Sequence, residues 1–130
     1  LEAALADVHP VLRYWGAMGC LLHPDLAREQ AQALRELAAD DPFSANRAAA
    51  AAALAGIGDT DAALAVLLEL LKLDDDIARL EVMNRIEDLG WIDRVPRAEI
   101  RRIAADGQTY YSAHVAEYWR TQRDWMFLPW

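Results

Sequence analysis

One cysteine, three histidines and two serines are the side chains in this chain of 130 residues that first suggest metal binding or nucleophilic chemistry. Cys20 and His23 stand three residues apart near a predicted helix end, and His9 lies in the turn before that helix. A structural zinc site needs four convergent ligands, and no further acid at ligand spacing completes this set. Cys20 also has no second cysteine with which to form a disulfide. The sequence therefore favours ordinary helix-end positions for these residues.

Other chemically suggestive patterns stop short of a site as well. The runs Asp74–Asp76 and Asp59–Asp61 resemble fragments of a calcium-binding loop, but the glycine and terminal glutamate of that loop are missing. Ser44 and Ser112 lie outside any nucleophile-elbow sequence, and the chain has no glycine-rich phosphate loop. The sequence predicts no catalytic residue, no cofactor and no metal, with the aspartates capping helices or facing solvent.

Charge and hydropathy narrow the classes of partner. A formal net charge of −8 and an isoelectric point near 4.7 would repel a phosphate backbone, so nucleic acid is not expected as a partner. No apolar run is long enough to span a bilayer, and we expect no membrane insertion. The chain begins without methionine or a signal-like segment, which predicts a fragment of a longer protein.

The elements that position these residues are expected to be helices. Glycine and proline gather at the borders of apolar segments, and no alternating run of β-branched residues is long enough for a strand. The sequence therefore predicts an all-α fold of about seven or eight helices in a single domain over residues 1–130. The expected helices cover residues 1–6, 10–22, 25–39, 41–55, 61–73, 77–89, 96–105 and 109–123.

Several helix ends are predicted from local chemistry. Pro10 suits the first turn of a helix, and Asp41 followed by Pro42 is expected to supply an N-cap and a first-turn residue. Asp59 or Thr60 is expected to cap the helix that follows.

An internal repeat is the strongest signal in the chain. Arg13, Arg47 and Arg79 each open a run of small and apolar residues, in steps of 34 and 32 residues. A further step of 34 residues reaches Ala113, where the arginine is lost. A fixed period in this range indicates stacked pairs of helices.

Aspartates accompany two of these arginines at the same offset. Asp7 precedes Arg13 as Asp41 precedes Arg47, whereas the third copy has Leu73 at that position. A turn aspartate can cap the second helix of a pair and accept hydrogen bonds from an arginine of the neighbouring repeat. We therefore expect Asp7, Arg13, Asp41, Arg47 and Arg79 to hold repeat to repeat.

The turn around Asp41, Pro42 and Arg47 resembles the HEAT repeat, in the shorter form of the phycobilisome-lyase-type repeats. The resemblance implies a right-handed α-α superhelix, a solenoid of HEAT or armadillo type. Signatures of tetratricopeptide and ankyrin repeats are absent from the sequence.

Four segments together resemble the C-terminal HEAT extension of bacterial arylsulfatase-family proteins. They are VLRYWGAMG at 11–19, DPFSANRAAAAAAL at 41–54, ARLEVMNRIEDLG at 78–90 and YYSAHVAEY at 110–118. Such enzymes carry their chemistry in a preceding domain around Cys-x-Pro-x-Arg. Here Leu22 stands where that proline would follow Cys20, so no catalytic residue carries over.

The resemblance implies a non-catalytic scaffold or protein-interaction module, in contact with its own catalytic domain, a second subunit or a peptide. It also implies a periplasmic or extracellular location. The alternatives are a free-standing HEAT-repeat adaptor that binds a peptide or protein, which would be cytoplasmic, and, less favoured, a bilin-lyase-like protein.

Aromatic residues mark both ends of the chain as candidate interaction surfaces. Tyr14 and Trp15 replace residues that are alanines in the second repeat, so the repeat itself does not require their bulk. A helix that precedes residue 1 in a longer protein is the segment that we most expect them to contact. At the other end the candidates are Trp119, Trp125, Met126, Phe127 and Trp130. Trp, Met and Tyr anchor many protein interfaces, but an apolar tail can equally cap the last repeat. Both interpretations of the tail stay open, with the cap favoured.

Overall fold

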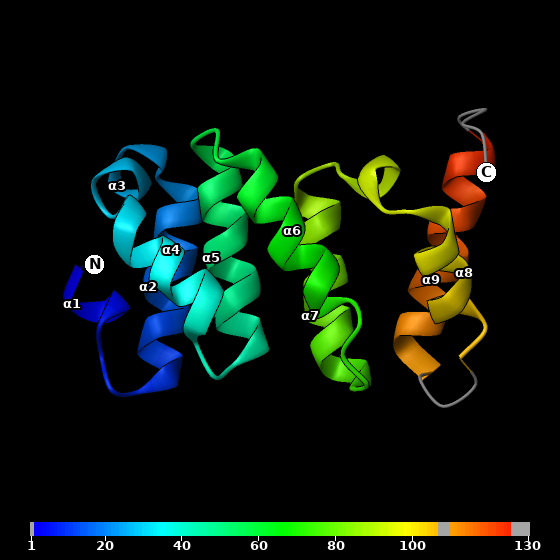
Figure 1. Ribbon diagram of the computed structural model, residues 1–130, viewed down its shortest axis with the longest axis horizontal. Helices are drawn as coiled ribbons and strands as arrows, with labels where there is room; N and C mark the ends of the chain where they lie inside the picture. The colour runs from blue at the N-terminus through cyan, green and yellow to red at the C-terminus, as the bar shows by residue number, and fades with distance from the viewer. Residues whose placement is uncertain (1, 107–109, 126–130) are drawn as a thin grey trace. The chain divides into compact units, whose positions relative to one another are not determined.

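The computed structural model describes residues 2–106 and 110–125, and the side chains of residues 3–106 and 111–122. Within these residues the chain forms nine α-helices and one 3-10 helix and no strand, which confirms the all-α prediction. The contacts group into two compact units, Leu1–Leu70 and Leu71–Trp130, called unit 1 and unit 2 (Figure 1). The single domain over residues 1–130 stays a prediction.

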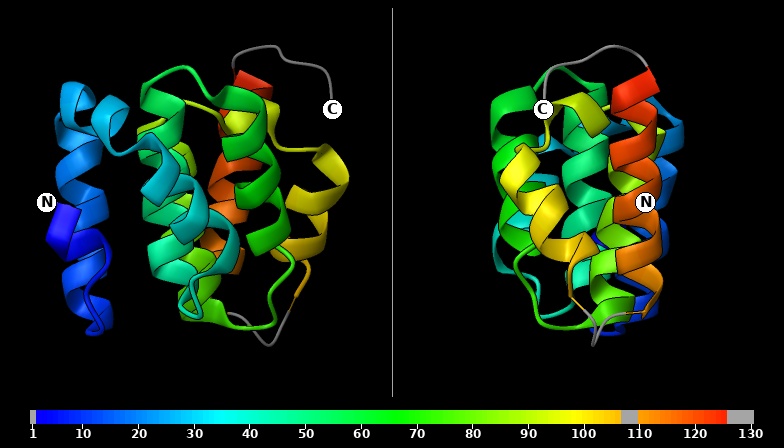
Figure 2. Two further views of the ribbon diagram at one scale, coloured as in Figure 1. Left: turned by 60° about the vertical axis from the view of Figure 1, so that its left-hand side comes forward. Right: turned by 90° about the vertical axis from the view of Figure 1, so that its right-hand side faces the viewer.

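Unit 1 has two layers of helices. Its helices are α1 (Glu2–Leu5), α2 (Pro10–Leu22), α3 (Pro24–Glu29), α4 (Ala31–Asp40), α5 (Ser44–Gly56) and α6 (Thr60–Leu70). One layer holds α1, α4 and α6, and the other holds α2 and α5, with α1 packed on α2 and α4 packed on α5 (Figure 1). α2 lies at one edge of the unit, as the left view of Figure 2 shows.

α5 forms the centre of unit 1. Six consecutive alanines, residues 48–53, are at most 1 % exposed, and α5 contacts α2, α3, α4 and α6. A helix enclosed on nearly every side has room only for small side chains when its neighbours approach closely. The alanine block is therefore the feature of the sequence that permits this packing.

Unit 2 is built around its last helix. It contains α7 (Asp76–Asp88), a 3-10 helix η1 (Ile92–Arg94), α8 (Arg97–Ala104) and α9 (Tyr110–Trp125). α9 packs against both α7 and α8, and the right view of Figure 2 shows α8 and α9 side by side. The core includes the fully buried residues Val82, Met83, Ile86, Ile100, Ile103, Ala116 and Trp119.

Several predicted helix boundaries are wrong. The helix expected over residues 61–73, for example, ends at Leu70. The helix expected over residues 25–39 breaks at Gln30, where the backbone leaves the α region at φ −104° and ψ 18°. No glycine or proline stands there. The break instead follows tertiary packing, because α3 contacts α2 whereas α4 contacts α1 and α6. Asp41 does not occupy the N-cap of α5, which begins at Ser44 with Phe43 at the cap position.

Other ends agree with the local chemistry. α2 begins at Pro10 and ends at Leu22 as predicted. Asp75 caps α7, since its carboxylate accepts the Ala78 N–H at 2.9 Å. Gly90 follows α7 with φ at +69°, a conformation that side chains with a Cβ rarely adopt.

Candidate interaction surface

Arg13 is held by three oxygens near the start of α2. Its Nε donates to Oδ2 of Asp41 at 2.7 Å, and its Nη1 donates to the carbonyls of Asp7 and Val8 at 2.9 and 3.1 Å. The Asp41 carboxylate is buried and also accepts from the Phe43 N–H and the Asn46 side chain. The pair therefore joins α2 to the turn before α5, and its charges face the protein rather than solvent.

The guanidinium groups of the other two repeat arginines, Arg47 and Arg79, also form hydrogen bonds within the protein. Arg47 Nε donates to the Ala38 carbonyl at 2.8 Å, and its Nη2 meets Glu69 at 3.2 Å. Arg79 is 1 % exposed, and its Nη2 donates to Asp106 at 3.1 Å, while its Nε has no hydrogen-bond partner among the described residues.

A common rule links the three contacts. Asp41 follows α4, Glu69 lies near the end of α6 and Asp106 follows α8. Arg13 of α2, Arg47 of α5 and Arg79 of α7 thus each contact an acid near the end of a later helix. Glu69 and Asp106 were missed from the sequence because they lie outside the Asp-to-Arg offset; their shared position at helix ends was the available signal.

The outer face of α2 is apolar and exposed. We use this name for Val11, Leu12, Trp15 and Leu22, which are 52, 47, 62 and 71 % exposed and recur at helical spacing. The opposite side of α2, with Ala17 and Cys20, is fully buried. Single exposed apolar residues are common, but several of them on one face of a helix make that face a candidate for association.

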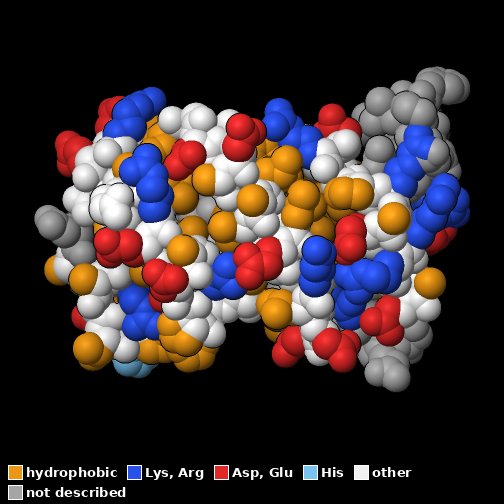
Figure 3. Space-filling model, in the orientation of Figure 1, with side chains coloured by type: hydrophobic (Ala, Val, Ile, Leu, Met, Phe, Trp, Pro, Cys, Tyr) orange, Lys and Arg blue, Asp and Glu red, His pale blue; other side chains and the backbone are white. Residues whose placement is uncertain are grey.

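α2 contains no charged residue other than Arg13, which is turned inward to Asp41. The Trp15 ring stands edge-on to that of Tyr14, with centroids 5.3 Å apart. Val8, just before the helix, is 95 % exposed. In Figure 3, apolar side chains gather at the lower left, where the turn before α2 lies.

Only part of the predicted aromatic surface at the other end is described. Trp119 is fully buried and its Nε1 donates to Glu87 at 2.6 Å, so this indole belongs to the core of unit 2 rather than to a surface. Trp125 ends α9, but its side chain lies outside the described residues, as do Met126, Phe127 and Trp130. Tyr111 and Tyr118 of α9 are exposed instead.

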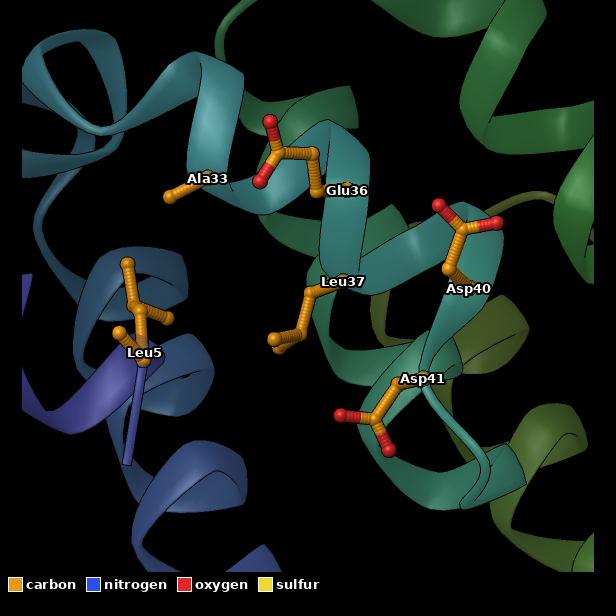
Figure 4. A pocket seen from close by; sticks show the side chains of 7 residues that line it. Leu5, Ala33, Glu36, Leu37, Asp40 and Asp41 are labelled. Atoms are coloured by element: carbon orange, nitrogen blue, oxygen red, sulfur yellow. The ribbon is translucent and has the colours of Figure 1, made fainter. Parts of the chain in front are cut away.

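A small pocket lies between α1 and α4, with a volume of about 250 Å³. Leu5 and Leu37 point toward each other across it, whereas the carboxylate of Asp40 points away (Figure 4). Asp41 also lines the pocket, but its carboxylate is already held by Arg13. The pocket is therefore a gap between two helices, with apolar side chains facing each other and carboxylates at its rim.

The residues considered for metal binding occupy structural positions. The His9 Nδ1 accepts the Val11 N–H at 3.3 Å and so caps α2, and His23 joins α2 to α3. Burial raises the pKa of the Cys20 thiol above its ordinary value, so the unreactive thiol form persists. In the described part of the chain, no cluster of three or more His, Cys, Asp or Glu side chains could hold a metal ion.

A contact between α7 and α9, which the sequence did not predict, fixes the start of α9. The Asp76 carboxylate accepts the N–H groups of Ser112 at 2.8 Å and Tyr111 at 3.2 Å, and thereby caps α9 from α7. Burial disfavours its charge, but the hydrogen bonds from Ser112 and Tyr111 and the charge of Arg79 outweigh it, so the pKa of Asp76 lies below its ordinary value.

Comparisons with protein-family models, with curated proteins and with solved structures found no match to this chain. Among the described residues, no helix has both the length and the apolar character needed to cross a membrane.

Proposed function

We propose that this chain is a non-catalytic helical-repeat module of the HEAT type, which binds a protein partner through the outer face of α2. The observation that carries the proposal is the stripe of Val11, Leu12, Trp15 and Leu22, exposed on a helix without an outward charge. Tryptophan and leucine side chains on such a face lose unfavourable contact with water when a partner covers them.

The repeat contacts support the architectural part of this proposal. Three arginines reach forward to an acid at successive helix ends, through Arg13–Asp41, Arg47–Glu69 and Arg79–Asp106. Repeats that use the same contact each time can stack into a right-handed solenoid, which is the superhelix we propose. These arginines are engaged within the chain, so their proposed role is architectural.

Site-specific photo-crosslinking tests the interaction. A photo-reactive residue at position 15 should give a protein adduct in the cells that produce the protein, and the same residue at position 118 of α9 serves as the matched control. The captured partner should bind the purified chain and lose binding with Trp15→Glu. No adduct at position 15, or equal adducts at both positions, would contradict the proposal, as would hydrolase or lyase turnover by the purified chain.

The narrower proposal is that the module is the C-terminal extension of a sulfatase-like hydrolase. It rests on the resemblance around Tyr14-Trp15-Gly16 and Val115–Tyr118. Within this segment, the close approach of α1 to α2 explains why residue 16 is glycine. A Cβ added to Gly16 would lie 3.1 Å from the Leu5 nitrogen. The parent reading frame tests this idea, since it must encode Cys-x-Pro-x-Arg or Ser-x-Pro-x-Arg upstream.

A further inference from the structure

The outer face of α2 is suited to one occupant in particular. We propose that a second copy of this chain packs there, with α2 antiparallel to α2 of the second copy. The inference rests on the proposed interaction function and names its partner. A two-fold contact brings the same surface of each copy together, so that surface must be complementary to itself in charge and in shape.

Charge is the first argument for self-pairing. The chain carries a net charge of −8, so most surfaces of two copies repel each other. α2 is an exception, because its single charged residue, Arg13, faces inward and forms an ion pair with Asp41. Two copies can therefore meet along α2 without bringing like charges of this helix into contact.

Shape is the second argument. Gly19 lies one helical turn after Trp15, on the same side of α2, and leaves a gap in the apolar stripe. In the antiparallel register that places Trp15 of one copy against Gly19 of the second, Leu12 of one copy lies against Leu22 of the second. The largest side chain thus meets the residue without a side chain, and two leucines meet each other.

Size determines the expected strength of the contact. α2 has 13 residues, so the stripe is about 20 Å long. One helix face of this length is smaller than the roughly 800 Å² per partner of a standard protein interface. The dimer should therefore be weak and form at micromolar concentrations or above, in rapid exchange with monomer.

Sedimentation velocity over about 1–200 μM tests the proposal. Wild-type chain should show a concentration-dependent shift from monomer to dimer, and Trp15→Glu should weaken the dimer at least about tenfold. Tyr118→Glu is the matched control, because Tyr118 is 55 % exposed on α9 and the substitution adds the same charge. Leu22→Lys provides a second variant on the stripe, with the opposite charge. Circular dichroism confirms that each variant stays folded.

Disulfide trapping tests the orientation. A mixture of Leu12→Cys chains and Leu22→Cys chains should form a cross-linked heterodimer on mild oxidation, whereas either chain alone should form little. Wild-type chain is the control, since its Cys20 thiol is buried. Cross-linking in Leu12→Cys chains alone would overturn the antiparallel arrangement.

Monomer at every concentration, or equal effects of Trp15→Glu and Tyr118→Glu, would overturn self-pairing. The proposed interaction function has its own test: it would be overturned if a photo-reactive residue at position 15 gave no protein adduct. A different protein captured at position 15, together with a monomeric chain, would overturn the second copy as occupant and leave the interaction function in place.

Discussion

At the scale of single residues, burial distinguishes the ion pairs of this chain from one another. The side chains of Arg13 and Asp41 are 14 and 2 % exposed, whereas those of Arg28 and Asp25 are 60 and 97 % exposed. Removing one partner of a buried pair leaves a charge that solvent cannot fully stabilise, and an exposed pair loses little. The same chemical change should therefore have very different costs at the two places.

We expect Asp41→Asn to lower the free energy of unfolding by about 2 kcal/mol or more, because Arg13 loses its carboxylate while remaining largely buried. Asp25→Asn, the matched control, should cost no more than about 0.5 kcal/mol. Urea denaturation followed by circular dichroism measures both. Equal costs would show that the Arg13–Asp41 contact does not stabilise unit 1.

At the scale of elements, α5 is fixed by close packing of small side chains, whereas α9 is fixed by hydrogen bonds at its N-terminus. α5 is enclosed by four helices and presents alanines to them. α9 begins at an N-terminus where two free N–H groups, those of Tyr111 and Ser112, donate to an acid from another helix, Asp76 of α7. Packing volume therefore limits what α5 can contain, and a carboxylate fixes where α9 begins.

Enlarging the buried face of α5 should disrupt its neighbours. We expect Ala50→Leu to lower the free energy of unfolding by about 2 kcal/mol or more, since Ala50 is fully buried in a close-packed site. Ala39→Leu adds the same atoms at an exposed position of α4 and should change stability by less than about 0.5 kcal/mol. Thermal and urea unfolding compare the pair, and a neutral Ala50→Leu would contradict the packing.

Removing the acid that caps α9 should destabilise unit 2 in a pH-dependent manner. We expect Asp76→Asn to cost about 1 kcal/mol at neutral pH, because one of the two N–H groups loses its acceptor. The pKa of Asp76 is lower in the folded than in the unfolded chain. Its contribution is therefore fully present above about pH 4 and is lost as the pH falls through the folded pKa.

The measurement is urea unfolding from neutral pH to below pH 3, in which the difference between wild-type chain and Asp76→Asn should shrink as the pH falls. Asp74→Asn changes an exposed acid of the same run and should cost no more than about 0.5 kcal/mol. A difference that stays constant with pH would mean that the ionised carboxylate is not what stabilises α9.

At the scale of the whole molecule, net charge opposes the association that the α2 outer face favours. Two copies bring two charges of −8 together, while the α2 contact itself adds no charge. Long-range repulsion and short-range apolar contact respond differently to salt, because ions screen the first and not the second.

Self-association should therefore strengthen with salt. Raising NaCl from about 0.1 M to about 1 M shortens the Debye length from about 10 to about 3 Å and reduces the repulsion between copies. Sedimentation velocity should show a larger dimer fraction at high salt for wild-type chain, but not for Trp15→Glu. A dimer that weakens with salt would indicate that ion pairs, rather than the α2 outer face, hold it together.

Much of the architecture could be predicted from the sequence because local rules suffice for it. Helix content, the exact span of α2 and the turn after α7 follow from periodicity, Pro10 and Gly90. These features depend on residues close together in the chain, so neighbours in sequence are also neighbours in structure. The spacing of Arg13, Arg47 and Arg79 likewise follows from the repeat.

Only the tertiary structure decided which residues of distant segments contact each other. The break at Gln30, the acids Glu69 and Asp106, and the cap that Asp76 gives α9 all depend on contacts between segments distant in sequence. Composition also could not separate Trp119 from Trp15, since both are tryptophans on amphipathic helices. Burial places the first in a core and leaves the second on the α2 outer face, because only packing determines which side of a helix another element covers.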